Sequence, residues 1–194
     1  MLLLIVGLAL FLGIHSFRML ASSKRSEILD SRGEGVYKGV YSLVSLAGLV
    51  LLIVGYGQAR LSPVLIWQPP AFMSHLAALL VLAAFILLAA AYVPGNHIKA
   101  RVGHPMVLAV KIWAFAHLLS NGTVADVILF GSFLVWAIVN YVLSKKRDRL
   151  AGVSYQPVSG ISRDAIVVVV GVLAWLVIAM WLHVRLIGVS PFSL

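Results

Sequence analysis

The chain has 194 residues, of which 62% are hydrophobic and only 11% are charged. Soluble domains carry about 45–50% apolar and roughly 25% charged residues, so this composition excludes an ordinary water-soluble fold. The formal net charge is +9, which on its own would be compatible with nucleic acid binding. The chain contains no cysteine, which excludes disulfides and any thiolate ligand or nucleophile.

Apolar stretches of about 20 residues, the length that spans a bilayer core as a helix, recur along the chain. Six candidates follow in order: Leu2–Leu20, Gly39–Gly57, Phe72–Val93, Met106–Leu119, Val124–Leu143 and Ala165–Ile187. The fourth of these is the shortest. The pattern predicts an all-α, polytopic integral membrane protein with about six transmembrane helices, in a single domain over residues 1–194.

The segments between these stretches are expected to be loops and turns, because they hold the helix-breaking residues. Pro94-Gly95 ends the third helix, and Pro105 suits the first turn of the fourth. The expected connections are a solvated loop at Ser22–Gly35, a proline-rich external stretch at Leu61–Ala71, a basic turn at His97–Gly103 and a long loop at Ser144–Asp164.

The basic residues are concentrated on alternate connections. Odd-numbered connections carry twelve of the fifteen Lys and Arg residues: Arg18, Lys24, Arg25, Arg32, Lys38, Lys99, Arg101, Lys145, Lys146, Arg147, Arg149 and Arg163. The positive-inside rule places these connections in the cytoplasm and both termini outside. No basic region precedes the first apolar run, so we expect an uncleaved first helix in a bacterial inner membrane. The charge therefore reflects membrane topology, with membrane lipid and not nucleic acid as the partner.

Two histidines fall inside apolar runs, where an ionisable side chain costs on the order of a few kcal/mol unless it is paired or ligated. His15 lies in the first run and His117 in the fourth. Arg18 and Lys111 lie nearby, and long basic side chains reach the headgroups, so both imidazoles are expected at similar depths in the inner half of the membrane. The helical repeat places His15 on a face with Leu8, Phe11 and Arg18, and His117 on a face with Val110, Trp113, Ala114 and Asn121.

Two interpretations of His15 and His117 stay open. Each ring could donate to a backbone carbonyl or to a neighbouring helix, because polar groups also hold membrane helices together. Alternatively, the two imidazoles are axial ligands of a haem iron, since aromatic and apolar neighbours suit an apolar macrocycle. Arg18, one turn toward the cytoplasm, would then neutralise a propionate. A structural zinc is disfavoured because it requires four ligands.

The other titratable groups are expected to be peripheral. We predict His75 and His183 at the external interface, and His97 and His104 as solvated or capping residues beside the basic turn. Asp126 starts the fifth long helix and suits its N-terminal dipole. The remaining acids are expected on solvated faces or at helix caps, with no acid–base pair: Glu27, Asp30, Glu34, Asp148 and Asp164.

Several stretches around these residues are distinctive. They are Leu-Gly-Ile-His-Ser-Phe-Arg at 12–18, Gly-Glu-Gly-Val-Tyr-Lys-Gly-Val-Tyr-Ser-Leu-Val-Ser at 33–45, Ala-Tyr-Val-Pro-Gly-Asn at 91–96, Gly-His-Pro-Met at 103–106, and Trp-Ala-Phe-Ala-His-Leu-Leu-Ser-Asn-Gly at 113–122. Together they resemble the NnrU family of bacterial membrane proteins, nearly end to end. That family is associated with denitrification and is similar to the plant 15-cis-zeta-carotene isomerase, a haem b membrane enzyme.

The resemblance implies haem b as the cofactor, with His15 and His117 at the positions most like the axial ligands of the isomerase. Trp113 and Ala114 belong to the same matching element, whereas Arg18 comes earlier than the arginine of the isomerase motif. The isomerase carries a cysteine, implicated in ligand exchange, where this chain has Ala114. The resemblance therefore does not carry a cysteine-for-histidine switch, or zeta-carotene isomerisation, over to this chain.

Three functions follow from these patterns. The first is a haem b-binding protein, a redox or isomerase-like enzyme on a lipophilic substrate that is linked to denitrification. The second is a non-enzymatic assembly or maturation factor for a respiratory nitric oxide or nitrite oxidoreductase, which the small hydrophilic loops favour. The third is a methyltransferase-like protein, because His104-Pro105 resembles an element of membrane methyltransferases. Gly103 replaces the arginine of that element, and Asp148 is the only acid in the region that would follow it, so the pattern disfavours methyl transfer.

Overall fold

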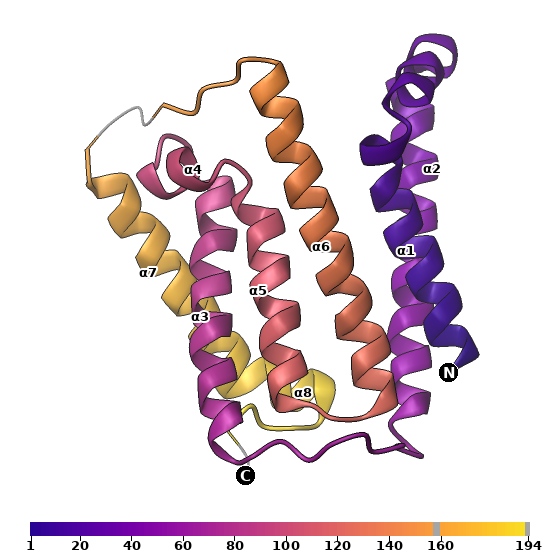
Figure 1. Cartoon of the computed structure of the whole chain (residues 1–194), viewed down its shortest axis with the longest axis vertical. Coiled ribbons are helices and arrows are strands. Elements are labelled where there is room, and N and C mark those ends of the chain that lie inside the picture. Colours follow the sequence, from indigo (N-terminus) through magenta and orange to yellow (C-terminus); the bar gives the residue numbers. More distant parts are fainter. Residues whose placement is uncertain (157–159, 193–194) are drawn as a thin grey trace. The chain divides into compact units, whose positions relative to one another are not determined.

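The computed structural model describes residues 1–156 and 160–192, apart from the side chain of Ser22. Figure 1 shows the elements in chain order: α1 (Leu2–Leu20), α2 (Ser22–Ala59), α3 (Phe72–Tyr92), α4 (His97–Val102), α5 (Pro105–Ser120), α6 (Val124–Leu150), α7 (Ser162–Val177), the π-helical turn η1 (Ile178–Leu182) and α8 (His183–Ile187). The described residues form no β-strand beyond one isolated bridge between Leu65 and Thr123. The predicted all-α class is confirmed.

Five helical segments within the described residues are long and apolar enough to cross a membrane: Leu2–Leu20, Ser23–Ala59, Phe72–Tyr92, Val124–Leu150 and Ser162–Ile187. The shortest predicted span corresponds to α5, which has 16 residues. At 1.5 Å per residue it is about 24 Å long, less than the roughly 30 Å of a bilayer core. The chain is therefore a multi-pass membrane protein in which α5 is shorter than the five membrane-length segments.

The loop predicted at Ser22–Gly35 is wrong, because α2 begins at Ser22. The helix changes direction at Gly33, whose φ of 80° and ψ of 160° are not helical. Glycine adopts positive φ at no steric cost, which allows the kink. Lys, Arg and Glu are good helix formers, so the charges of this segment end the apolar run without ending the helix.

The turn predicted at His97–Gly103 is also wrong, since it contains the short helix α4. Asn96 caps this helix, with its side-chain oxygen accepting from the backbone N–H of Lys99 at 2.7 Å. Gly103, with φ of 76°, ends it. Likewise, the loop predicted at Ser144–Asp164 begins later than expected, because α6 continues to Leu150. Here too, polar residues continue the helix beyond the apolar run.

By its internal contacts the chain divides into two compact units. The first comprises Met1–Ile66 and Thr123–Ser132, and the second comprises Trp67–Gly122 and Phe133–Leu194. The predicted non-helical stretch at Leu61–Ala71 is confirmed and runs from one unit into the other.

In the first unit, α1 and α2 pack backbone against backbone. Gly7, Gly48 and Gly55 lie at the contact, and a Cβ on any of them would overlap backbone atoms of the facing helix; on Gly7 it would lie 2.6 Å from the nitrogen of Leu52. Glycine permits close approach where lipid offers no hydrophobic driving force between helices. Two glycines of α2 and one of α1 thus make this close contact.

In the second unit, α3 packs against both α5 and α7. Its core contains Ala89 and Ala90 together with Val167 of α7. A Cβ on Gly171 would lie 2.6 Å from the Cα of Ile86, so one close backbone approach also brings α7 against α3. Small side chains therefore set the spacing between α3 and α7.

Candidate functional site

His15 lies near the end of α1 in the first unit and is half-buried. Its Nδ1 is 2.6 Å from the carbonyl oxygen of Phe11, one helical turn earlier. The imidazole also contacts two aromatic rings, with centroids 4.3 Å from Phe11 and 5.3 Å from Tyr41. Because a carbonyl oxygen only accepts, Nδ1 carries the hydrogen and Nε2 carries the lone pair in the neutral ring.

His117 has the same local arrangement on α5 in the second unit. Its Nδ1 is 2.8 Å from the carbonyl oxygen of Trp113, and its ring centroid is 5.0 Å from the indole. Trp113 in turn contacts Phe133 edge-on at 5.5 Å. The same tautomer follows, with the hydrogen on Nδ1 and the lone pair on Nε2.

The hydrogen-bonding interpretation of both histidines is thereby confirmed, and it is compatible with ligation. A histidine that binds a metal through one ring nitrogen commonly donates from the other to a carbonyl, which fixes its tautomer and orientation. Two other predicted cofactor residues are each three positions from one of these histidines in the sequence. Ala114 of α5 is fully buried with 0% exposure, and Arg18, at the end of α1, is exposed.

His97 and His104 differ from the prediction, because each is paired with a carboxylate. His97 Nδ1 lies 2.6 Å from Asp164 Oδ2, and its backbone N–H donates to Asp164 Oδ1 at 2.9 Å. His104 Nε2 lies 2.7 Å from Asp148 Oδ2. His97 keeps a partly exposed ring and His104 occupies the N-cap position of α5, as expected, but the expectation that no acid–base pair stands out is wrong.

Asp148 also accepts a hydrogen bond from the Tyr155 hydroxyl at 2.9 Å. Burial raises the pKa of the Tyr155 phenol above its usual 10.0, and the hydrogen bond and negative charge of Asp148 raise it further. Tyr155 is thus a hydrogen-bond donor at neutral pH. The cluster of His104, Asp148 and Tyr155 joins the start of α5 to the end of α6 and the segment after it.

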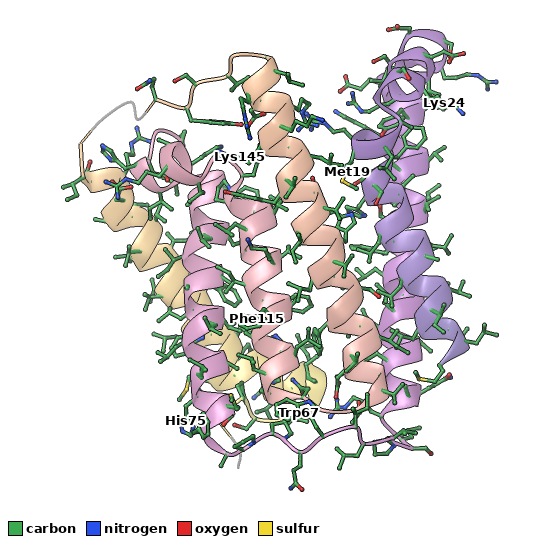
Figure 2. The ribbon with its side chains drawn as sticks, viewed as in Figure 1. Met19, Lys24, Trp67, His75, Phe115 and Lys145 are labelled. Carbon is green, nitrogen blue, oxygen red and sulfur yellow. The ribbon has the colours of Figure 1, made fainter. Side chains whose placement is uncertain are left out.

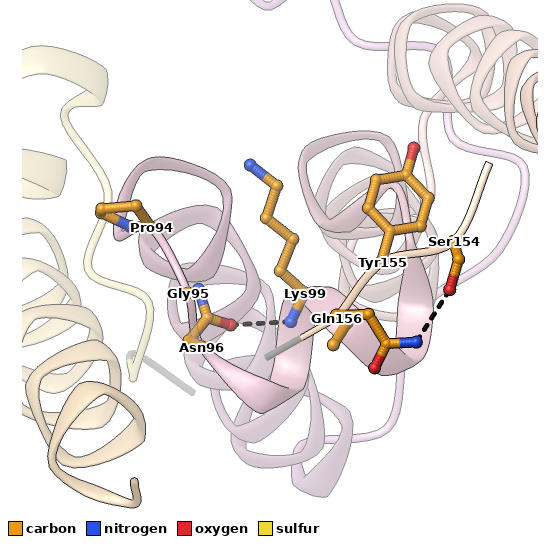
Figure 3. Close-up of a pocket in the computed structure, with 8 residues that line it drawn as sticks. Pro94, Gly95, Asn96, Lys99, Ser154, Tyr155 and Gln156 are labelled. Carbon is orange, nitrogen blue, oxygen red and sulfur yellow. Dashed lines mark hydrogen bonds between the residues drawn. The ribbon is translucent and has the colours of Figure 1, made fainter. Parts of the chain in front are cut away.

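A cavity of about 290 Å³ lies beside this cluster and is lined by residues 94–96, Lys99, Ala100 and residues 154–156. Figure 3 shows Lys99 between the Pro94–Asn96 segment and Tyr155. Figure 2 shows that Lys145 of α6 lies at the same end of the second unit, opposite the end that holds Trp67 and His75. Sequence reasoning missed this cavity, because its two walls are far apart along the chain.

Asp126 is in the first turn of α6, as predicted for an N-terminal dipole partner. It is only 4% exposed and accepts from the Tyr56 hydroxyl at 2.6 Å. The backbone N–H and the hydroxyl of Thr123 also donate to it, at 2.9 and 2.6 Å. Asp126 therefore ties the end of α2 to the start of α6 within the first unit.

Two further histidines have only local contacts in the structure as described. His183 Nδ1 is 2.6 Å from the carbonyl oxygen of Val189, and His75 Nδ1 is 3.5 Å from the hydroxyl of Ser74. Among the described residues, no group of three or more His, Asp or Glu side chains could hold a metal ion. A haem iron does not require such a group, because the macrocycle supplies four of its ligands and the protein only the axial ones.

Comparison with known proteins gives a family assignment. A family model described as NnrU protein matches residues 3–191, nearly the whole chain. No curated protein and no solved structure matches it.

Proposed function

The chain belongs to the NnrU family, and from this premise we propose that it is a haem b-binding protein of the bacterial inner membrane, with His15 and His117 as axial ligands. The observation that carries the proposal is the geometry that these two histidines share. Each lies on an apolar helix, packs against an aromatic ring and donates its Nδ1 hydrogen to the carbonyl four residues earlier. Nε2 is therefore the ring nitrogen that would bind the iron.

The residues of the chain have separate roles in this proposal. The Phe11 and Trp113 carbonyls would hold the two imidazoles in the ligating tautomer, and the guanidinium of Arg18 would neutralise a propionate at the cytoplasmic side. Haem b supplies redox chemistry when bound. The apolar helices would hold it where a lipophilic substrate could reach it through the bilayer.

An optical spectrum of the detergent-solubilised full chain tests the proposal. Protein purified from haem-replete cells should show a Soret band, and His15→Ala and His117→Ala should each lose it. His183→Ala is the matched control, because His183 also donates from Nδ1 to a backbone carbonyl but lies near the C-terminal end of the last helical segment. Colourless wild-type protein, or a band that survives both substitutions, would contradict the proposal.

The link to denitrification and the isomerase-like activity are supported by the family resemblance. Growth of a deletion strain on nitrite as electron acceptor tests the first, and loss of growth that only haem-competent variants restore is the expected result. Isomerisation is tested by turnover of a cis-polyene in proteoliposomes, with His117→Ala as the inactive control.

The short connections between the described helices favour a second candidate, an assembly or maturation factor for a respiratory nitric oxide or nitrite oxidoreductase. Connections such as residues 93–96 and 121–123 offer little polar chain for a soluble catalytic site. In this case the purified chain would be colourless and without turnover, and would co-purify with the oxidoreductase. The spectrum described above separates the two candidates.

A further inference from the structure

The cavity lies at the end of the second unit that carries Lys99, Lys145 and Arg163, which we call the basic end. One of its lining residues is a buried asparagine with several hydrogen bonds. Asn96 is 2% exposed; its amide donates to the Ala90 carbonyl at 2.9 Å, and its oxygen accepts from the Lys99 backbone at 2.7 Å. The Lys99 ammonium reaches back to the carbonyl of Ala91 at 3.1 Å. These bonds hold Lys99 over the end of α3 while its half-buried side chain lines the cavity.

Two further cations lie at the edges of this cavity. Arg163 donates from Nη1 to the carbonyl of Pro94, a lining residue, at 3.4 Å. The ammonium of Lys145 and the ring of Tyr155 each lie 3.3 Å from the position of a Cβ on Gly103, and Tyr155 also lines the cavity. A cation of α4 therefore lines this small cavity, and cations of α6 and α7 lie beside residues that line it.

The carboxylates of this region do not cancel these charges. Residues 97–103 and 144–164 contain seven Lys and Arg against two acids, Asp148 and Asp164. Both acids are engaged by histidines, at 2.7 and 2.6 Å, and Asp148 also accepts from Tyr155. The segments around the cavity consequently carry an excess of positive charge, and Lys99 brings one of these cations into its lining, which suits an anion.

The size and position of the cavity indicate which anion. Its volume of about 290 Å³ is at the lower end of the roughly 300–1,000 Å³ of small-molecule sites, which suits a small headgroup. It lies beyond the C-terminal end of α3 and the N-terminal end of α7, where apolar helices leave the hydrocarbon. Basic pockets at this level of a membrane protein bind anionic lipid headgroups.

We propose that this cavity binds the phosphate of an anionic phospholipid, with Lys99 as the central contact and Arg163 and Lys145 at its rim. The proposal is independent of haem binding. It predicts that the second unit keeps a phosphatidylglycerol molecule through purification, while zwitterionic lipids exchange. The shared chemistry is a phosphate group, so a soluble phosphate ester is the other source that the experiment must distinguish.

The test is native mass spectrometry of the full chain released from nanodiscs that contain phosphatidylglycerol and phosphatidylcholine. Wild type should retain phosphatidylglycerol in preference to phosphatidylcholine. Lys99→Gln should reduce that preference about fivefold, the effect of one cation near an anionic headgroup, and Lys99→Arg should preserve it. Lys145→Gln, which leaves the Lys99–Ala91 bond in place, should reduce it in the same direction.

Lys146→Gln is the matched control, because it removes the same charge from an exposed neighbour of the cavity-edge residue Lys145. It should change the preference less than twofold. Displacement of the lipid by an equal concentration of glycerol 3-phosphate would assign the phosphate site to a soluble ester, and retention would assign it to the lipid. Equal retention of both lipids by wild type, or an equal loss in Lys146→Gln and Lys99→Gln, would overturn the proposal.

Discussion

The two units of this protein use glycine contacts and polar side chains in different proportions to hold their helices together. In the first, Gly7, Gly48 and Gly55 bring α1 and α2 into backbone contact, and the Tyr56–Asp126 hydrogen bond joins α2 to α6. In the second, Gly171 makes one such contact, and two histidine–carboxylate pairs lie at the basic end: His97–Asp164 and His104–Asp148. Yet each unit contains one intramembrane histidine with the same bond to the carbonyl four residues earlier. The comparison teaches that two differently packed helices orient a histidine in the same way.

The largest effect is expected at the glycine contact of the first unit. Gly55→Ala introduces a Cβ that overlaps the backbone of Leu4, and such overpacking lowers the free energy of unfolding by about 2–3 kcal/mol. Unfolding of the purified protein in mixed micelles by increasing SDS measures it. Gly57→Ala is the control, because nothing lies within 4 Å of a Cβ there and Ala is the better helix former by about 1 kcal/mol. Equal destabilisation by both variants would contradict the packing account.

A smaller effect is expected at the polar pairs of the second unit. His104→Ala removes the partner of Asp148 at a partly exposed site, and a bond of this kind contributes about 1 kcal/mol to the free energy of unfolding. Combining it with Asp148→Asn in a double-mutant cycle should give a coupling energy of similar size. Additive effects of the two substitutions would mean that the pair contributes nothing.

The smallest effect is a pH dependence at Tyr155, whose raised pKa reflects burial and the neighbouring Asp148. Because the folded state holds this proton more tightly than the unfolded state, the stabilisation is fully present below the ordinary pKa of 10.0. It is lost as the pH rises through the folded-state value. The difference in melting temperature between wild type and Tyr155→Phe should therefore be constant near neutral pH and shrink above pH 10. A difference that grows with pH would reverse the assignment.

Much of this architecture could be predicted without coordinates. The helix at Leu2–Leu20 is predicted with its bounds as observed, and the third ends within a residue of the prediction. Hydropathy over about 20 residues is sufficient for this, because a membrane helix satisfies its own backbone and needs only an apolar surface. The same signal fails at Ser22–Gly35, where a charged but helix-forming segment extends α2.

For the candidate site too, features within one helix could be predicted, and contacts between distant segments could not. His15 and His117 could be found as ionisable groups in apolar runs, and their hydrogen bonds could be anticipated because the partner is one turn away on the same helix. The pairing of His97 with Asp164 could not be anticipated, since the partners lie 67 residues apart. For His104 and Asp148 the separation is 44 residues.

The amino-acid sequence by itself thus determined the membrane class, the order of the apolar helices, the family and the two intramembrane imidazoles, because each depends on composition or on neighbours within one helical turn. The tertiary structure alone decided which glycines are contact points, which acids accept from His97 and His104, and that Lys99 lines a cavity. These properties depend on which helices meet, because the local sequence of a segment does not identify the distant segment that it contacts.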